Sequence, residues 1–317
     1  MSEFDLIRTH FARLGHPRPD VLLGVGDDCA LLRVPAGQDL AVSIDTLVAG
    51  VHFLRDCDPE SLGHKALAVG LSDLAAMGAE PAWATLALTL PPGLPGSQPG
   101  WLAGFCRGLG ALARQYGVAL VGGDTTSGPL SVSIQVHGLV PSGQAVRRRG
   151  AAPGDLVCVS GTLGDAGLAL RQVLAGEPVA EGLRLRLDRP EPRVALGLAL
   201  RGVASAMIDC SDGLAADLGH ILAASGVGAE IHLGSLPQSK AVAAVGDWSL
   251  ALTAGDDYEL CFTLPPARRP VLSRLATAGG VALAVIGQIE QEPGLRCRLP
   301  DGTELPLTRT GYDHFAG

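Results

Sequence analysis

The sequence is poor in lysine and has no long run of basic residues. Its 317 residues contain 24 Lys and Arg against 32 Asp and Glu, which gives a formal net charge of −8. The only lysines are Lys65 and Lys240, and the longest basic run is Arg147-Arg148-Arg149. Because a protein that binds nucleic acid needs a basic face, we expect no nucleic-acid partner.

Long apolar segments and paired cysteine motifs are also missing. No stretch of about 18 uncharged apolar residues occurs, so we predict no membrane span. Residues 1–15 carry acidic side chains early and lack the apolar core of a signal peptide, so we expect a cytoplasmic protein. The seven cysteines include no CxxC pair, and several lie in apolar, strand-like runs. Buried reduced thiols are therefore favoured over disulfides or a zinc site.

The common nucleotide-binding motifs are absent as well. The sequence has no P-loop, no glycine-rich kinase loop with a downstream H-R-D, and no G-x-G-x-x-G segment at the start of a helix. Residues 161–165 follow a strand-like run and precede a helical pattern. An anion could bind there at the helix N-terminus, although a tight strand-to-helix turn is the favoured interpretation.

The amino-acid composition of the chain is typical of an α/β protein. The chain is 47% hydrophobic but only 4% aromatic, and Ala, Gly, Leu and Val carry the apolar content, as in helices packed closely on sheets. A length of 317 residues corresponds to about two domains. We place the boundary near residue 145, in an Arg-rich connection, and so predict an N-terminal domain of residues 1–145 and a C-terminal α/β domain of residues 146–317.

Apolar periodicity and turn residues predict the helices and strands of both domains. The segment 176–193 is polar and contains proline, and we assign no helix or strand to it. We expect helices at 2–14, 64–77 and 101–116, from 164 to about 174, at 193–204, and from 213 to about 224. We expect strands at 21–25, 30–34, 40–44, 83–90, 118–121, 131–140, 156–160, 229–233, 259–264, 281–287 and 295–299.

Carboxylates recur beside glycine or serine in six short segments. We interpret each as a turn at which a strand or an apolar run stops, and a single Asp beside Gly is first of all turn chemistry. Asp45 and Asp73 are less easily explained as turn residues. They lie at the edges of strongly apolar runs, where a buried carboxylate would be costly without a cation. The six segments are 24–28, 43–46, 71–73, 122–124, 209–213 and 255–259.

The recurrence of these segments favours a site for divalent cations and phosphate. Mg²⁺ prefers oxygen ligands and usually takes one or two carboxylates together with phosphate oxygens and waters. Glycine beside an aspartate lets the backbone approach a phosphate closely. Because the chain has so few lysines, the scattered acids imply phosphates that are bridged by metal, as in a site for Mg-ATP.

The acidic segments and their flanks form an ordered set: GVGDDCALL at 24–32, SIDTLVAGVHF at 43–53, HKALAVGLSDLAAMGAEPAW at 64–83, LVGGDTTSGPL at 120–130, IDCSDGLAADLGH at 208–220, GDDYELCFT at 255–263 and GYDHF at 311–315. In this order they resemble the thiamine-monophosphate kinase family of the aminoimidazole-ribonucleotide-synthetase superfamily, nearly from end to end. The resemblance implies direct transfer of the γ-phosphoryl group of ATP onto thiamine monophosphate, giving thiamine diphosphate. It also implies a homodimer in which the mixed N-terminal sheets of two subunits pair and close a barrel. ATP would lie between the N-terminal and C-terminal domains.

The resemblance further implies roles for individual residues. Family members often carry Glu where this chain has Asp256, whose side chain is one methylene shorter. Magnesium ions would bind Asp28, Ser43, Ile44 (through its backbone carbonyl), Asp45, Asp73, Asp124, Asp209 and Asp212. ATP would contact Gly123, Asp124, Arg148 and Ser211. Thiamine monophosphate would contact His52, Asp256 and Tyr312.

The implied reaction needs no general base. The attacking group is a phosphate oxygen, which is already anionic near pH 7 because its second pKa is about 6. Catalysis then consists of aligning two polyanions and neutralising the charge that repels them. This agrees with the lack of any Ser-His-Asp or Cys-His arrangement, and it gives Arg148 a direct phosphate contact.

Several alternatives stay open. Another ATP-using enzyme of the superfamily is one, although the chain lacks both the reactive N-terminal Cys of selenophosphate synthetase and the terminal Cys of the hydrogenase-maturation dehydratase. A metal-dependent phosphate-ester hydrolase would release phosphate without ATP, and a non-catalytic regulator would bind Mg-ATP without turnover. At the level of residues, His52 and Tyr312 could be packing groups. Asp217 and Asp257 are interpreted as caps or turn acids.

Overall fold

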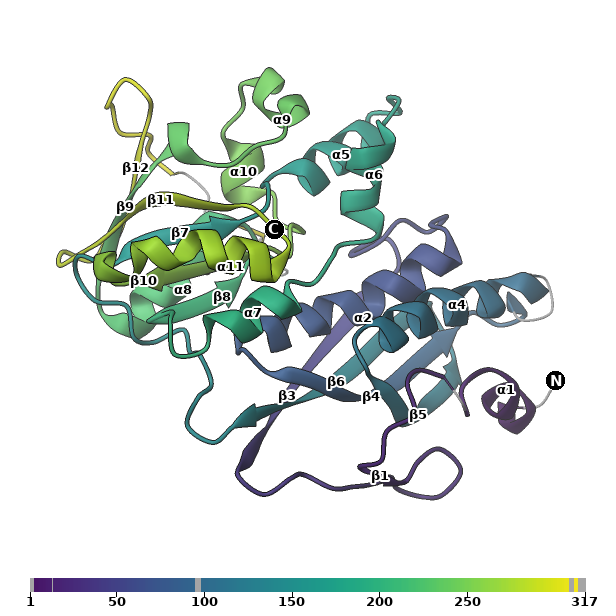
Figure 1. Ribbon diagram of the computed structural model, residues 1–317. Coiled ribbons are helices and arrows are strands. Elements are labelled where there is room, and N and C mark those ends of the chain that lie inside the picture. The colour runs from purple at the N-terminus through teal and green to yellow at the C-terminus, as the bar shows by residue number, and fades with distance from the viewer. Residues whose placement is uncertain (1–2, 13, 95–97, 308–310, 313–317) are drawn as a thin grey trace. The chain divides into compact units, whose positions relative to one another are not determined.

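The chain forms two compact α/β units (Figure 1). The computed structural model describes residues 3–12, 14–94, 98–307 and 311–312. Each unit has its own sheet and its own helices. The N-terminal unit comprises Met1–Leu74 and Ala79–Gly143, and the C-terminal unit comprises Ala75–Gly78 and Gln144–Gly317.

The N-terminal unit is built on a four-stranded mixed sheet. Its strands are β3 (Gln38–Val48), β4 (Glu80–Leu90), β5 (Ala119–Ser127) and β6 (Ser131–Pro141), and its main helices are α2 (Pro59–Ala76) and α4 (Pro99–Gln115). The strand order is β3-β6-β4-β5, with β6 antiparallel to both neighbours and β5 parallel to β4. Parallel neighbours need a crossover connection, which α4 supplies between β4 and β5.

Two glycines let α2 and α4 approach each other backbone to backbone. A Cβ atom added at Gly63 would stand 2.0 Å from the carbonyl oxygen of Phe105, and one added at Gly108 would stand 1.8 Å from that of Glu60. Any other residue carries a Cβ atom, so both contacts depend on glycine. The two helices are thereby fixed against each other. Asp73 lies on α2, which is one of these two helices.

One ion pair anchors the N-terminal segment to this sheet. Arg18 Nε and Nη2 donate to the two oxygens of Asp20 at 2.9 and 2.6 Å. Trp83 Nε1, on β4, donates to Asp20 Oδ1 at 3.0 Å. The elements of this segment are α1 (Glu3–His10), β1 (Val21–Leu23) and β2 (Leu31–Leu32), of which the two strands form a small antiparallel sheet.

The C-terminal unit is built on a six-stranded sheet. Its strands are β7 (Leu156–Ser160), β8 (Ala206–Asp209), β9 (Gly228–His232), β10 (Leu260–Leu264), β11 (Leu283–Glu290) and β12 (Gly294–Arg298). The order is β12-β9-β11-β7-β10-β8, and the neighbours are antiparallel except for β9 and β12. The helices are α5 (Asp165–Leu174), α6 (Glu181–Asp188), α7 (Val194–Leu200), α8 (Leu214–Ser225), α9 (Lys240–Val245), α10 (Ser249–Thr253) and α11 (Leu272–Gly279), with 3-10 turns at Leu233–Ser235 and Pro266–Val271.

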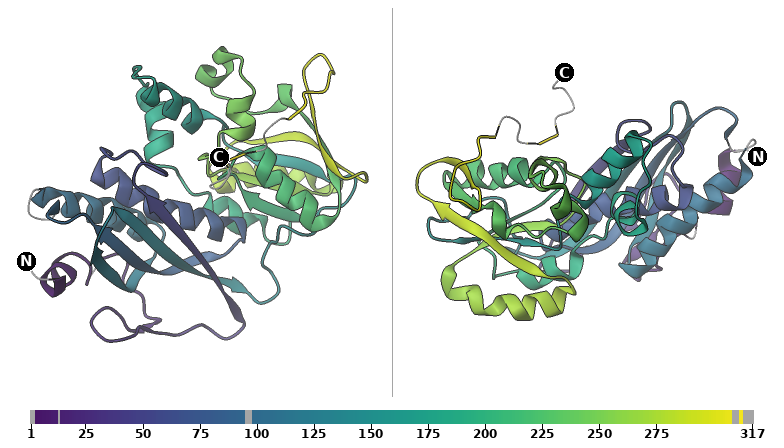
Figure 2. Two further views of the ribbon diagram at one scale, coloured as in Figure 1. Left: turned by 180° about the vertical axis from the view of Figure 1, so that it is seen from behind. Right: turned by 90° about the horizontal axis from the view of Figure 1, so that it is seen from above.

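Helices cover both faces of this sheet (Figure 2). On one face, Leu214, Leu218 and Ile221 of α8 join Val159 and Ile231 of the sheet in one buried cluster. The other face is covered by α7 and α11, which pack against each other. The strands β7, β8 and β10 are therefore almost completely buried, whereas the β9–β12 edge carries exposed polar side chains.

The structure corrects several predicted elements. The helix predicted at 64–77 begins five residues earlier, at Pro59, since proline suits the first turn of a helix. Helix α6 lies in the segment 176–193, to which we assigned no helix. Its Leu183 and Leu187 are four residues apart and are both buried, but the Leu-Arg alternation between them hides the helical period. The short helices α9 and α10 and the helix α11 were not predicted either.

Three of the predicted acidic turns are wrong. Asp45 lies inside β3, Asp73 lies inside α2, and Asp124 lies inside β5. The strand predicted at 118–121 continues through Gly122 and Gly123 to Ser127 because its pairing with β4 continues along the whole length. These carboxylates are therefore held by regular elements rather than by loops.

The remaining structural expectations concern membranes and cysteines. Among the helices that the structure describes, none is long and apolar enough to cross a membrane. All seven cysteines are free. Four of them are buried, whereas Cys29 is exposed, so the expected burial is wrong for that residue.

Candidate active site

In the N-terminal unit, three of the predicted metal ligands lie together on one face of the sheet. Side chains alternate along a strand, so Ser43 and Asp45 of β3 point to the same face, which α2 covers. The Ser43 hydroxyl donates a hydrogen bond to the Asp73 carboxylate of α2. Asp45 Oδ2 lies close to the α2 backbone at Gly70, where an added Cβ atom would stand 3.5 Å from it.

The environment of the Asp45 carboxylate disfavours its negative charge. Its Oδ2 atom is buried and has no hydrogen-bond partner. Burial, and then the negative charge of Asp73, raise the pKa of Asp45 to about 7. A nearby cation would stabilise the carboxylate anion in this position.

These three residues fit a magnesium ion. Mg²⁺ is commonly held by one or two carboxylates while waters and substrate phosphates fill the other positions. Two carboxylates and one hydroxyl supply the protein's share of such a shell. The other positions of such a shell are open to waters and to phosphate oxygens. Within the described ranges, no group of three or more His, Cys, Asp or Glu that could hold a metal ion is found.

Two other predicted metal ligands have side chains on the opposite face of this sheet. Directly opposed residues on neighbouring strands share a face, and the register of β5, β4, β6 and β3 connects Asp124 with Thr46. Thr46 follows Asp45 in the chain and so faces the other way. Ile44 lies on the same outer face as Thr46 and is 63% exposed. The structure thus separates the Asp124 side chain from the face that carries Asp45, and it leaves Ile44 only its backbone carbonyl as a possible ligand.

Asp28 and Gly123 are placed by local backbone geometry. Asp28 is exposed in the connection between β1 and β2, where its N–H donates to Asp27 Oδ1 at 2.9 Å. Gly123 has a φ of 149°, and a Cβ atom there would stand 1.9 Å from the carbonyl oxygen of Leu86. Only glycine fits this position, so β5 lies against β4 without a side chain between them.

His52 has a defined ring orientation. Its backbone N–H donates to the Val48 carbonyl at 3.0 Å, and the Val48 N–H donates to His52 Nδ1, also at 3.0 Å. Because Nδ1 accepts a hydrogen bond, the neutral ring carries its proton on Nε2. His52 is thus prepared to donate from Nε2.

In the C-terminal unit, three loops meet at the end of β8. They are the loop after β8, the loop before β10 and the described pair of residues 311–312. The Asp256 N–H donates to the Ser211 carbonyl at 2.8 Å. The Tyr312 N–H donates to the Asp212 carbonyl at 3.0 Å. Backbone hydrogen bonds therefore bring together residues that the sequence predicted for ATP, metal and substrate.

Asp209 and Arg148 border the same loops. Asp209 ends β8 and is only 4% exposed. Nearby, Asp217 Oδ2 accepts hydrogen bonds from the N–H groups of Asp212 and Gly213 at 3.2 and 3.1 Å, which confirms its interpretation as a cap. Burial and the charge of Asp212 raise the pKa of Asp217 to about 7, and the positive charge of Arg148 opposes this shift. Arg148 is therefore within electrostatic range of the loop after β8.

Comparison with known proteins identifies the family. Residues 26–140 match the family model of the AIR synthase related protein, N-terminal domain, and residues 152–300 match that of its C-terminal domain. The chain is 50% identical over 324 residues to the thiamine-monophosphate kinase of Escherichia coli O157:H7, which covers 99% of this chain and 98% of the relative. The chain belongs to the thiamine-monophosphate kinase family.

Solved structures agree with this family assignment. The crystal structure of thiamine-monophosphate kinase from Stenotrophomonas maltophilia K279a is 48% identical, with a TM-score of 0.83 and coverage of 91% of this chain and 93% of that one. The structure of AaThiL complexed with AMPPCP and TMP is 32% identical, with a TM-score of 0.78 and coverage of 89% of each chain. The predicted two-domain α/β fold and the predicted family are confirmed.

The sequence analysis missed a buried ionic cluster beside the loop before β10. Glu259 is fully buried, and Arg193 Nε and Nη2 donate to its two oxygens at 2.7 and 2.6 Å. Arg186 Nη2 donates to Glu259 Oε1 at 2.8 Å. These arginines are 66 and 73 residues from Glu259 in the chain, so no local pattern connects them. The apolar run 260–264 that follows Glu259 was the one sign of its burial.

The strand-to-helix turn at 161–165 contacts carboxyl groups of the chain itself. The Gly164 N–H donates to both oxygens of Asp257, at 2.9 and 3.1 Å. A Cβ atom added at Gly161 would stand 2.1 Å from Glu259 Oε1. Burial raises the pKa of Asp257 well above its ordinary value. The tight-turn interpretation is therefore confirmed. In this member of the kinase family, the Gly164 N–H that could have bound an external anion is bound by the Asp257 carboxylate.

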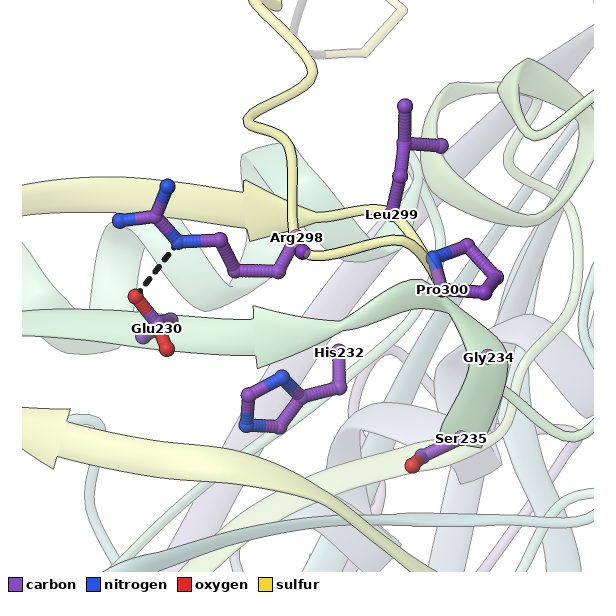
Figure 3. A pocket seen from close by; sticks show the side chains of 8 residues that line it. Glu230, His232, Gly234, Ser235, Arg298, Leu299 and Pro300 are labelled. Atoms are coloured by element: carbon purple, nitrogen blue, oxygen red, sulfur yellow. Dashed lines mark hydrogen bonds and ion pairs between the residues drawn. The ribbon is translucent and has the colours of Figure 1, made fainter.

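A shallow pocket at the β9–β12 edge of the C-terminal sheet contains none of the predicted site residues (Figure 3). Arg298 Nε donates to Glu230 there at 2.8 Å, and Arg298 Nη1 lies 3.4 Å from Glu304. The arginine is thus already neutralised by carboxylates, and we assign no part of the kinase site to this pocket. Its volume is about 450 Å³, and it is lined by Glu230, His232, Gly234, Ser235, Arg298, Leu299, Pro300 and Gly302.

Proposed function

We propose that the protein transfers the γ-phosphoryl group of ATP directly onto the phosphate of thiamine monophosphate, giving thiamine diphosphate and ADP. The pair of Asp45 and Asp73 carries this proposal in a chain of the thiamine-monophosphate kinase family. One of these two neighbouring carboxylates has a buried oxygen without a partner. Such an arrangement is completed by a divalent cation and by the phosphates that the cation binds.

Magnesium ions would be held by two groups of residues. When bound, they would neutralise phosphate charge, so that two polyanionic substrates can approach each other. In the N-terminal unit these residues are Ser43, Asp45 and Asp73 on the face covered by α2, Asp124 on the opposite face, the carbonyl of Ile44, and Asp28 in the connection between β1 and β2. The C-terminal group is Asp209 and Asp212.

The nucleotide would be bound by backbone and by one arginine. Gly123 would contact the nucleotide through its backbone. Arg148 would contact a phosphate directly, because a guanidinium matches the geometry of phosphate oxygens. The remaining proposed ATP contacts are Asp124 and Ser211.

Thiamine monophosphate would be bound by His52, Asp256 and Tyr312. His52 would donate from Nε2 to a phosphate oxygen, since its Nδ1 atom is already engaged by the Val48 N–H. No residue needs to remove a proton, because the attacking phosphate oxygen is anionic near pH 7, its second pKa being about 6. The residues of the chain therefore act through position and charge.

We further propose a homodimer that is formed through the N-terminal sheet. Leu40, Val42 and Ile44 on the outer face of β3 are 44%, 50% and 63% exposed, and β3 ends the strand order. A row of exposed apolar side chains on an edge strand is normally covered by a partner. In this proposal residues 1–145 form the domain that binds metal and ATP and forms the dimer, residues 146–317 form the C-terminal α/β domain, and the enzyme acts in the cytoplasm.

The proposal is tested by incubating the protein with Mg-ATP and thiamine monophosphate and measuring thiamine diphosphate and ADP. We expect both products in equal amounts and no turnover in EDTA. A phosphate-ester hydrolase would instead release phosphate from thiamine monophosphate without ATP, and a regulator would bind Mg-ATP without forming either product. Absence of thiamine diphosphate would contradict the proposed function.

A further inference from the structure

The loop that carries Asp256 has an unusual backbone. Asp256 and Tyr258 have φ values of 64° and 51°, and they are the non-glycine residues with positive φ in the described part of the chain. For a bulky side chain such as that of Tyr258 this conformation is a clear outlier. Such conformations persist only where the surroundings hold them. Other contacts must therefore stabilise this loop.

Backbone hydrogen bonds tie the loop to the neighbouring loop after β8. The Tyr258 N–H donates to the Cys210 carbonyl at 2.8 Å, and the Cys210 N–H donates to the Glu259 carbonyl at 2.7 Å. The Asp256 N–H extends this ladder to Ser211 at 2.8 Å. A displacement of Glu259 is thus transmitted along the loop to Asp256.

The Glu259 side chain is the fixed end of this ladder. Its carboxylate is fully buried and accepts the two bonds from Arg193 and the one from Arg186. The Ser160 hydroxyl donates a further bond to Glu259 Oε2 at 2.5 Å and accepts the N–H of Leu260 at 2.9 Å. Charge-assisted and bidentate bonds are the strongest and the most directional in proteins.

Arg186 also holds the loop through its backbone. The same Nη2 atom that binds Glu259 lies 3.3 Å from the Asp257 carbonyl oxygen and 3.2 Å from that of Thr162, and it donates to both. The Asp257 side chain is fixed in turn by the Gly164 N–H. The residues on both sides of Tyr258 are therefore clamped.

The ion pairs of Glu259 with Arg186 and Arg193 affect the conformation of the loop that carries Asp256. Removing one partner of a buried ion pair leaves an uncompensated charge, and the loop can relieve that charge by moving Glu259 toward water. Asp256 has a strained backbone conformation that this framework helps to hold, so it would relax as well. The conformation of Asp256 thus depends on Arg186 and Arg193, although both lie outside the loop.

We propose that the cluster of Glu259, Arg186 and Arg193 is a positioning device for the substrate loop, which holds Asp256 in the orientation that binds the phosphate-bearing substrate. The inference rests on the proposed function, in which Asp256 contacts thiamine monophosphate. The three cluster residues are positioning residues, since they act through Asp256.

The first test is Arg193→Lys, which keeps the positive charge but loses the two-pronged contact with Glu259. We expect the KM for thiamine monophosphate to rise about tenfold, the effect of losing one charge-assisted hydrogen bond. The KM for ATP should change by less than about twofold, because uniform damage to the fold would affect both substrates. Hydrogen exchange of the Asp256 and Tyr258 amides should become faster. Arg186→Lys should act in the same direction and replaces the first variant if that one does not fold.

Two further variants separate this inference from its alternatives. Ser205→Ala is the matched control, because it removes a hydroxyl donor from another buried carboxylate of the same unit, Asp155, at 2.6 Å. It should leave both KM values unchanged. Asp256→Ala tests the substrate contact directly and should raise the KM for thiamine monophosphate.

The outcomes distinguish the two levels of the proposal. If Asp256→Ala raises the KM for thiamine monophosphate but Arg193→Lys and Arg186→Lys do not, the positioning role is wrong and the proposed function stands. If the arginine variants raise both KM values equally, the cluster has only a structural role. If Asp256→Ala has no effect, the substrate contact fails and the positioning role fails with it.

Discussion

Replacing Asp45 by Asn tests the electrostatics of the proposed metal site. The substitution keeps the shape of the side chain but removes its charge. In the unfolded chain the carboxyl group titrates near 3.8, whereas in the folded protein its pKa is raised to about 7. Folding of the metal-free protein therefore takes up a proton between these values. Its free energy of unfolding falls as the pH rises from about 4 to about 7 and stays low above that range.

The size of the effect follows from this shift. A change from 3.8 to about 7 is about three pKa units, which at about 1.36 kcal/mol each sets an upper limit of about 4 kcal/mol. Asp45 is half-buried, and water and local relaxation reduce the penalty to about 1–2 kcal/mol. Asp45→Asn should therefore stabilise the metal-free protein by this amount at pH 8, and by less than about half as much at pH 5. Its magnesium-dependent kinase activity should fall severely.

Urea unfolding in EDTA at both pH values measures this difference, and a magnesium titration of the same samples shows whether the ion still stabilises the variant. Asp39→Asn is the control, because Asp39 lies on the same strand but is exposed and already accepts a hydrogen bond from Ser142 at 2.8 Å. It should change neither the stability nor the response to magnesium. A lower free energy of unfolding for Asp45→Asn at pH 8 would refute the reasoning, as would near-normal turnover at limiting Mg²⁺.

Two further substitutions test the packing and the assembly of the N-terminal unit. Gly108→Ala should lower the free energy of unfolding by about 3 kcal/mol, since its Cβ atom would stand 1.8 Å from the Glu60 carbonyl oxygen. Gly100→Ala, on the same helix with nothing within 4 Å, should not destabilise the protein, and equal urea midpoints for both variants would contradict the packing argument. Val42→Lys should halve the mass measured by light scattering, because it places a charge in the proposed dimer face, and an unchanged mass would exclude that face.

Local sequence patterns predicted the elements that carry their own start and stop signals. The strand predicted at 131–140 is β6 (Ser131–Pro141), and the strand predicted at 156–160 is β7 (Leu156–Ser160). The helix predicted to end near 174 is α5, which follows Gly164 in a left-handed conformation. In these cases one periodicity runs uninterrupted between turn residues, so the local sequence is enough to predict the type of element and its ends.

The arrangement of the site depends on contacts that no local pattern contains. Ser43 and Asp73 are 30 residues apart in the chain and meet only because α2 covers one face of β3. The face on which Asp124 lies is decided by strand register, which includes an irregularity between β4 and β5. The family resemblance grouped these residues by function, but it could not assign them to faces of a sheet. The cluster around Glu259 escaped both approaches, because its arginines are distant in sequence and belong to no motif.

The close contact of α2 and α4 has a consequence for the choice of cation. Helices that touch backbone to backbone cannot roll against each other without a clash, so the helix that carries Asp73 is fixed relative to α4. Ca²⁺ tolerates irregular shells of six to eight oxygens, at about 2.3–2.6 Å, whereas Mg²⁺ requires a compact octahedron at about 2.0–2.1 Å. A stiff pair of carboxylates discriminates between these ions by geometry. Two glycines far from any ligand would in this way help to exclude calcium.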